Sequence, residues 1–397
     1  MQNYLDRIIN DSPFQHLEDY WDKFKPVAFA IFDDKNVFLF NHPKCKEEPY
    51  TKLVKTDEFL ACTCILFEGI PTAIVDTSLY DSFEDIYSLL VHESFHVFQY
   101  LFEEGRFPNE ILGFSYPIDF NNIQLRILER QKLFEAYKAT DLIEKCLKIN
   151  EFITFREKRM ELFLEYVEYE NLIETIEGPA FYVEYQALKD VSLSKENLIN
   201  KYIEQLLDNN SSQTNIRSSC YNSGLFICLL LDEISDDWKL DFTKSNLDLY
   251  HFFREIYSDY NPIELIISDN SEEVFEIMNI AQKKKLRAFN HFNNTEGIKL
   301  TISGAIKIVG FDPMNVTQLD MTALHHNFVS ISIINNEFFI DIPVFTTFEN
   351  NFRDVQSVEL FLNEPPINIG NQFIIKGIGE FEGTIISKNP TSIHIAV

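Results

Sequence analysis

The chain has 397 residues, of which 45% are hydrophobic and 14% aromatic, and these proportions exclude an intrinsically disordered protein. Its formal net charge of −28 repels phosphate backbones and anionic lipids, so we expect neither nucleic acid nor a membrane surface as a partner. No run of about 18 apolar residues predicts a transmembrane helix, and the first residues lack the apolar core of a secretory signal.

The six cysteines form no C-x-x-C pair. Cys62 and Cys64 would share one face of a strand, and Cys228 falls within an apolar helical run. This pattern favours buried free thiols in a reducing compartment, and we therefore expect a cytoplasmic protein.

Two strand pairs are expected before residue 80. Residues 27–41 contain two strands around an Asp33–Asn36 turn, and residues 58–76 contain two more around Glu68-Gly69. The N-terminal region is therefore expected to form a small sheet.

A helix is expected next, over residues 82–105. It begins with Ser82-x-x-Asp85, which is similar to a capping box, and Gly105 is a suitable end. Apolar residues recur between them at roughly helical spacing, and the sequence VFQYLF at 97–102 indicates that the helix is buried.

The motif His92-Glu93-Ser94-Phe95-His96 lies inside this helix and has the form H-E-x-x-H. Because positions i and i+4 lie one above the other on a helix, His92 and His96 can bind one metal ion. Glu93 can reach a water on that metal. Two imidazole ligands and a carboxylate base are what a zinc hydrolase requires.

The chain is then predicted to be helical for a long stretch, near 121–148 and 151–188. Charged residues interleave with apolar ones there, as is typical of amphipathic helices with charges on their exposed faces. The second segment contains the sequence E-G-x-A-x-Y-x-E at residues 177–184.

This sequence resembles the second motif of the gluzincin metallopeptidases, especially the aminopeptidase and leukotriene-hydrolase group. The resemblance implies that Glu177 is the third zinc ligand, with Tyr182 and Glu184 following at the family's spacing. Glu174 and Glu184 are then either carboxylates that orient the histidines or solvated carboxylates on a helix.

Two features depart from the pattern of the aminopeptidase group. Glu177 follows His96 by 81 residues, which requires a helical insertion at about 106–170. Pro179 cannot donate a backbone hydrogen bond, so the helix is expected to kink there or to restart with Pro179 in its first turn.

Residues 215–240 form a third block, with an apolar run that begins at Gly224. Related peptidases often carry a Tyr-x-x-Gly helix after the E-G motif, and by this resemblance Tyr221 stabilises a tetrahedral oxyanion. The alternative is a tyrosine that packs at the start of a helix. Arg217 either holds a substrate carboxylate or pairs with an acidic neighbour.

The composition changes after residue 290. Residues 291–297 resemble a linker, and period-2 patterns between turn signals then predict a β-rich domain over 298–397. His325 and His326 have no partner at ligand spacing, and we interpret them as structural.

Taken together, the sequence predicts an α+β protein. A zincin-like domain over 1–290, with a small N-terminal sheet and a mainly helical body, precedes the all-β domain at 298–397. The predicted function is a zinc metallopeptidase that cleaves a peptide or protein substrate, with Glu93 as the general base. Because zincins place a sheet edge beside the metal, residues 58–76 are expected to hold the peptide. The alternative is a non-catalytic, metal-containing module whose β domain binds a partner.

Overall fold

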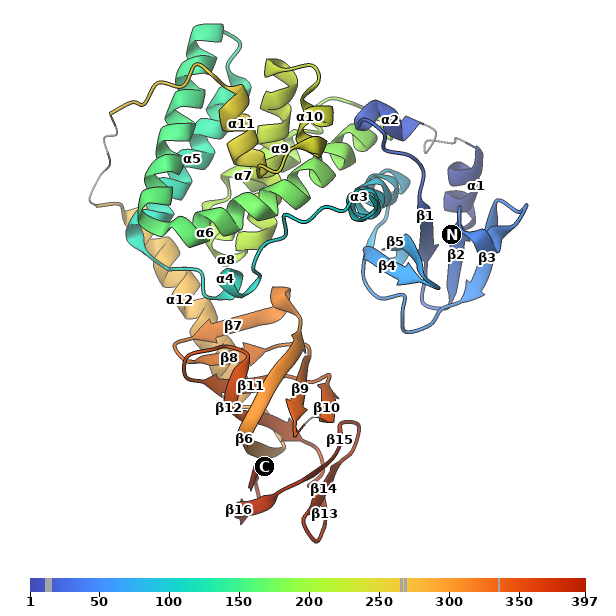
Figure 1. Cartoon of the computed structure of the whole chain (residues 1–397), viewed down its shortest axis with the longest axis vertical. Coiled ribbons are helices and arrows are strands. Elements are labelled where there is room, and N and C mark those ends of the chain that lie inside the picture. The colour runs from blue at the N-terminus through green and yellow to red at the C-terminus, as the bar shows by residue number, and fades with distance from the viewer. Residues whose placement is uncertain (11–15, 265–266, 268–269, 335) are drawn as a thin grey trace. The chain divides into compact units, whose positions relative to one another are not determined.

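A computed structural model of the chain describes residues 1–10, 16–264, 267, 270–334 and 336–397 (Figure 1). The chain forms two compact units. The first comprises Met1–Pro108 with Asn121–Asp269, and the second comprises Asn109–Phe120 with Asn270–Val397. The α+β class is confirmed. Among the described residues, no helix is both long enough and apolar enough to cross a membrane.

The first unit begins with two short helices and a five-stranded sheet of order β3-β2-β1-β5-β4. Its elements are α1 (Gln2–Asn10), α2 (Leu17–Tyr20), β1 (Ala28–Phe32), β2 (Asn36–Phe40), β3 (Tyr50–Val54), β4 (Thr63–Phe67) and β5 (Ile70–Asp76). The expected hairpin between β4 and β5 is confirmed, because Phe67 pairs with Ile70. The two turn residues, Glu68 and Gly69, have φ angles of 49° and 79°, as a tight turn of this kind requires.

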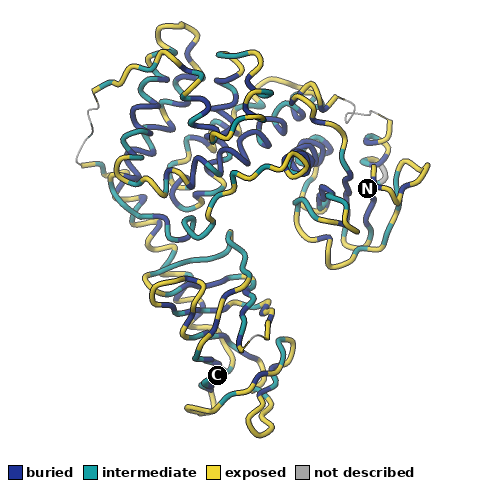
Figure 2. The backbone as a smooth tube through the Cα atoms, in the orientation of Figure 1, coloured by how far each residue is buried: buried dark blue, intermediate teal, exposed yellow. Residues whose placement is uncertain are grey.

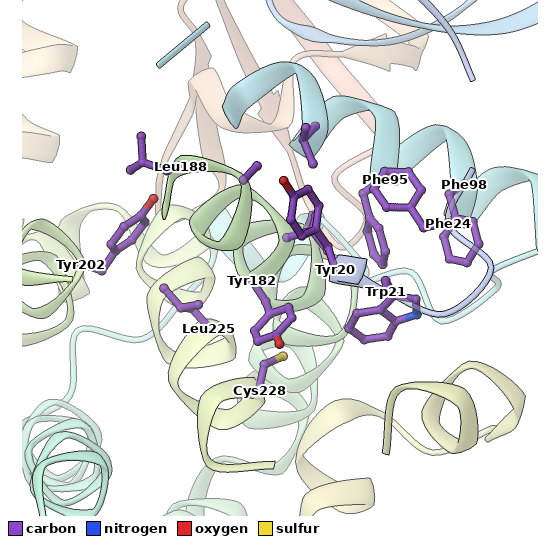
Figure 3. Close-up of a cluster of buried hydrophobic side chains, with 14 of the residues drawn as sticks. Tyr20, Trp21, Phe24, Phe95, Phe98, Tyr182, Leu188, Tyr202, Leu225 and Cys228 are labelled. Carbon is purple, nitrogen blue, oxygen red and sulfur yellow. The ribbon is translucent and has the colours of Figure 1, made fainter. Parts of the chain in front are cut away.

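Helix α3 (Phe83–Leu101) follows the sheet and is buried along most of its length (Figure 2). Phe95 and Phe98 of this helix pack into an aromatic cluster with Trp21 and Phe24 (Figure 3). The ring of Phe95 lies 5.1 Å from that of Trp21 and 5.3 Å from that of Phe24, and Phe98 lies beside them. This packing fixes the position of α3 against the segment that contains Trp21 and Phe24.

The helical body of the first unit is built from α5 (Phe120–Lys138), α6 (Leu142–Val191), α7 (Asn200–Leu207), α8 (Asn209–Thr214), α9 (Ile216–Ile234), α10 (Trp238–Lys244) and α11 (Leu249–Ile256). Helix α6 folds back on itself at Phe163, whose backbone angles are not helical. Arg156 donates to Glu174 although the two are 18 residues apart, a separation of about 27 Å along a straight helix. The two arms of α6, residues 142–162 and 164–191, therefore lie side by side.

A network of buried charges joins these arms to α5. Its members are exposed by at most 2%: Arg126, Glu129, Arg130, Arg156, Arg159, Glu170 and Glu174. The expectation that these segments carry their charges on exposed faces is wrong for these residues. They are buried because each guanidinium finds carboxylate, amide, hydroxyl or carbonyl oxygens within the bundle.

The second unit combines helices with mainly antiparallel sheets. Its elements are α4 (Ile111–Phe114), α12 (Glu272–Asn293), β6 (Ile298–Phe311), β7 (Val316–Leu319), β8 (Thr322–His325), β9 (Val329–Ile333), β10 (Asn336–Ile340), β11 (Val344–Phe348), β12 (Asp354–Leu362), β13 (Ile367–Ile369), β14 (Gln372–Ile375), β15 (Gly379–Glu382), β16 (Thr384–Asn389) and β17 (Ser392–Ala396). The larger sheet is antiparallel except where β17 runs parallel to β6.

The boundary between the units differs from the expected one near 290–298. Helix α12 belongs to the second unit, because Phe289 and Phe292 on its last turns pack with Leu324 of β8 in one apolar cluster. The segment 291–297, expected as a linker, therefore begins as helix. His325 is fully buried in this unit, 3.3 Å from the hydroxyl of Thr346.

Candidate metal centre

Helix α3 presents both motif histidines on one face. Ser82 caps its N-terminus by accepting a hydrogen bond from the backbone N–H of Asp85, as the capping-box pattern predicts. Four residues make slightly more than one turn, and the Nε2 atoms of His92 and His96 lie 3.0 Å apart.

The returning arm of α6 brings Glu177 to these histidines. Its Oε2 lies 3.3 Å from Nε2 of His96 and 3.6 Å from Nε2 of His92. Among the described residues, these three form the one group of histidine, cysteine and carboxylate side chains placed to share a metal ion. The predicted triad therefore comes together although His96 and Glu177 are 81 positions apart, because the chain leaves α3 through α5 and the first arm of α6 and returns with the second arm.

The distances within the triad fit a tetrahedral ion. Ligand atoms about 2.05 Å from a tetrahedral zinc lie about 3.3 Å from one another. The three separations, 3.0, 3.3 and 3.6 Å, average to that value. Oε2 of Glu177 is buried and receives no hydrogen bond from the described residues. A buried acceptor that faces two imidazole nitrogens is satisfied by a cation between them.

The electrostatics of the triad also favour a central positive charge. Burial disfavours the charged form of His92, but the carboxylates of Glu177 and Glu184 outweigh it and raise its pKa to about 10. Burial likewise opposes charge on His96, yet Glu177 raises its pKa. The pKa of Glu177 falls well below its ordinary range despite burial, because both histidines stabilise its charged form. Protons and metal ions therefore compete for the same positions.

A contact between two glycines sets the distance between α6 and α9. A Cβ atom on Gly178 would lie 2.8 Å from the Cα of Gly224, and one on Gly224 would lie 2.6 Å from the Cα of Gly178. The two backbones therefore touch directly beside Glu177. This contact gives a physical reason for the glycines of both the E-G and the Tyr-x-x-Gly sequences.

Helix α9 brings two polar side chains to the triad. Arg217 donates to Oε1 of Glu177 at 2.7 Å, so it pairs with an acidic neighbour. The Tyr221 ring stands 6.4 Å from that of His92. Burial and the charge of Glu177 raise the pKa of Tyr221 far above its ordinary value, so its hydroxyl is a proton donor at neutral pH.

Of the two expected orienting carboxylates, only Glu184 lies at the histidines. Its Oε2 is 3.1 Å from Nδ1 of His92, and Tyr202 donates to its other oxygen at 3.3 Å. Glu174 is turned instead toward Arg156 and Ser223.

Helix α6 continues through Pro179 without a non-helical residue, so the expected restart there is wrong, and the break lies at Phe163.

Glu93 lies on the side of α3 that faces the sheet edge. It is 7% exposed, and burial raises the pKa of its carboxyl while the two histidines oppose the rise. Strand β4 forms that edge, whereas β5, the other half of the expected segment 58–76, lies inside the sheet. Burial and then the charge of Glu93 raise the pKa of Cys64 on β4 to about 11, which keeps this thiol neutral.

Two residues of the site, Gln99 and Tyr80, were not predicted from the sequence. Oε1 of Gln99 lies 2.8 Å from Nδ1 of His96 and can only accept a hydrogen bond, and helical spacing could have identified Gln99 because it lies three residues further along α3. Burial raises the pKa of the Tyr80 phenol to about 12, with smaller contributions from Cys62, Glu184 and Glu93, and no sequence pattern indicated this residue.

Comparison with known protein families, curated proteins and solved structures found no match for this chain.

Proposed function

We propose that this protein is a zinc-dependent hydrolase that cleaves peptide bonds. The observation that carries the proposal is the convergence of His92 Nε2, His96 Nε2 and Glu177 Oε2 at tetrahedral separations, with the buried carboxylate of Glu93 on the same helix. Three protein ligands, none of them cysteine, are typical of a catalytic zinc site, which keeps its fourth position open.

His92, His96 and Glu177 would hold the ion. A bound zinc ion supplies Lewis acidity, which activates water at neutral pH and polarises a carbonyl group. Arg217 donates a hydrogen bond to Oε1 of Glu177, and Oε2 of the same carboxylate is directed at the histidines. Glu184 holds the ring of His92 from its Nδ1 side.

The remaining residues handle protons and charge. Glu93 accepts a proton from the attacking water and delivers it to the leaving amine. Its raised pKa brings the carboxyl closer to neutral pH, where a group that both accepts and donates a proton works best. Tyr221 donates its hydroxyl proton in a hydrogen bond to the oxyanion that forms on the substrate carbonyl.

Strand β4 supplies a means of holding the substrate. Within the described part of the chain it is an edge strand, so the backbone N–H and C=O groups on one side pair with no other described strand, and an extended peptide can pair with them. This arrangement favours a peptide or protein substrate.

All six cysteines are free, which supports the proposed location in the reducing cytoplasm. The resemblance to gluzincins rests on the same residues that form the proposed site: His92, Glu93, His96, Glu177, Glu184 and Tyr221.

Elemental analysis of protein purified without added metal or chelator tests the metal centre. We expect about one zinc per chain, and its loss in Glu177→Ala. A peptide library analysed by mass spectrometry then tests the chemistry, and Glu93→Gln should keep the zinc while losing hydrolysis. Wild-type protein that takes up no zinc would refute the proposal. Bound zinc without cleavage of any peptide would instead favour the non-catalytic metal-containing module.

A further inference from the structure

One side chain on α3 touches both the second histidine and the helix that carries the third ligand. Gln99 is 8% exposed and lies one turn beyond His96. Its Nε2 donates to the backbone carbonyl of Ile176 at 2.8 Å, and its Oε1 lies 2.8 Å from Nδ1 of His96. Ile176 directly precedes Glu177 in the chain.

The orientation of the Gln99 amide follows from what its partners can do. A backbone carbonyl only accepts hydrogen bonds, so the NH₂ group of Gln99 must face Ile176. The amide oxygen then faces His96, and an oxygen only accepts. Nδ1 of His96 must therefore carry a proton, and in the neutral ring that a metal ion requires, the lone pair is then on Nε2, which faces Glu177.

We infer that Gln99 is a positioning residue, which holds His96 in the Nδ1–H form and ties that ring to the backbone beside Glu177. This inference rests on the proposed metal function, because the Nε2 lone pair matters only if it binds a cation. It gives the two histidines different partners, a neutral amide for His96 and the carboxylate of Glu184 for His92. The three negative charges of Glu93, Glu177 and Glu184 then equal the combined positive charge of a divalent ion and Arg217.

Zinc affinity, measured by competition with a chromophoric chelator, tests the inference without any substrate. Gln99→Met removes both hydrogen bonds and should raise the zinc Kd about 10- to 100-fold. Gln99→Glu keeps an acceptor for Nδ1–H but loses the donor to Ile176, and it should bind zinc at least as tightly as the wild type. Gln131→Met is the matched control, since Gln131 is exposed on α5 and bonds only Glu135 among the contacts described for it.

The outcomes separate the possible roles. A wild-type Kd in Gln99→Met would overturn the inference. Equal weakening in Gln99→Met and Gln99→Glu would also overturn it, because Gln99 would then act only as a tie between helices. If Gln99→Met does not fold, Gln99→Glu still separates these roles. In the zinc-loaded wild type, ¹⁵N NMR should show His96 protonated at Nδ1, and protonation at Nε2 would refute the assignment.

The proposed function is judged by different results. Zinc bound by the wild type but without peptide cleavage would refute hydrolysis and leave the role of Gln99 standing. A wild type that binds no zinc would refute both, since Gln99 would then position no ligand.

Discussion

Substituting Gly178 with alanine tests whether the contact between α6 and α9 positions the site. The added Cβ would lie 2.8 Å from Cα and 2.9 Å from the carbonyl carbon of Gly224. Carbon atoms pack at about 3.5–4.0 Å, so the two helices must separate by roughly 0.7–1.2 Å. Both contacting atoms belong to helix backbone, which cannot turn aside as a side chain can.

The magnitude follows from two opposing effects. Alanine is favoured over glycine within a helix by about 1 kcal/mol. Overpacking of a well-packed core costs typically about 1–3 kcal/mol, and we expect it to prevail here because backbone meets backbone. Helix α9 carries Arg217 and Tyr221, and a displacement of about 1 Å near reacting groups can lower a rate about 100-fold. Gly178→Ala should therefore lose more activity than its modest loss of stability explains.

Thermal unfolding, zinc content and peptide hydrolysis of Gly178→Ala should be measured together. The ligands of the triad lie on α3 and α6, so zinc should be retained while hydrolysis falls. Gly105→Ala is the control, because the nearest atom to its added Cβ would be a backbone oxygen at 4.0 Å. Unchanged stability and turnover in Gly178→Ala would refute the role assigned to the glycine contact.

Three further predictions concern charges. Arg156→Met leaves Glu129 and Glu174 without their principal buried partner and should lower the free energy of unfolding by about 3–5 kcal/mol in urea titrations; a change below 1 kcal/mol would mean that the network reorganises around the loss. Burial lowers the pKa of His325 to about 4, so the unfolded chain binds the extra proton. The contribution of neutral His325 is therefore fully present above pH 6.5 and is lost as the pH falls from about 6.5 to about 4, by up to about 3 kcal/mol. Urea unfolding at several pH values should show this loss, and His325→Gln should flatten it; an equal pH dependence in that variant would exclude His325 as the cause. Glu184→Ala should weaken zinc binding about 10- to 100-fold in chelator competition, and an unchanged Kd would show that this carboxylate does not orient its histidine.

Sequence patterns predicted the elements whose signals lie within a few residues. The capping contact of Ser82 and the placement of His92 and His96 on one face follow from helix geometry alone. The turn at Glu68-Gly69 was predictable because those two positions need left-handed backbone angles. The β-rich C-terminal region was likewise indicated by its period-2 patterns.

Other features were not predictable because they depend on which distant segments meet. Whether a buried arginine such as Arg156 is tolerated depends on carboxylates that lie 18 and 27 residues away. The reversal at Phe163 carries no proline or glycine signal, whereas Pro179, which does, lies within continuous helix. The assignment of α12 to the second unit rests on contacts of Phe289 and Phe292 with strands that follow.

The sequence by itself determined that His92 and His96 share one face of a helix with Glu93 beside them, because a single helix holds these residues at fixed spacing. The family resemblance predicted that Glu177 joins them, but only the tertiary structure brings its carboxylate to the two rings. Glu177 reaches the histidines because α6 folds back and Gly178 lets α9 pack against its backbone. The sequence left open whether Glu174 and Glu184 orient the histidines, and the packing of the helices places Glu174 against Arg156 and Glu184 at Nδ1 of His92, because these contacts join segments that are distant in the chain.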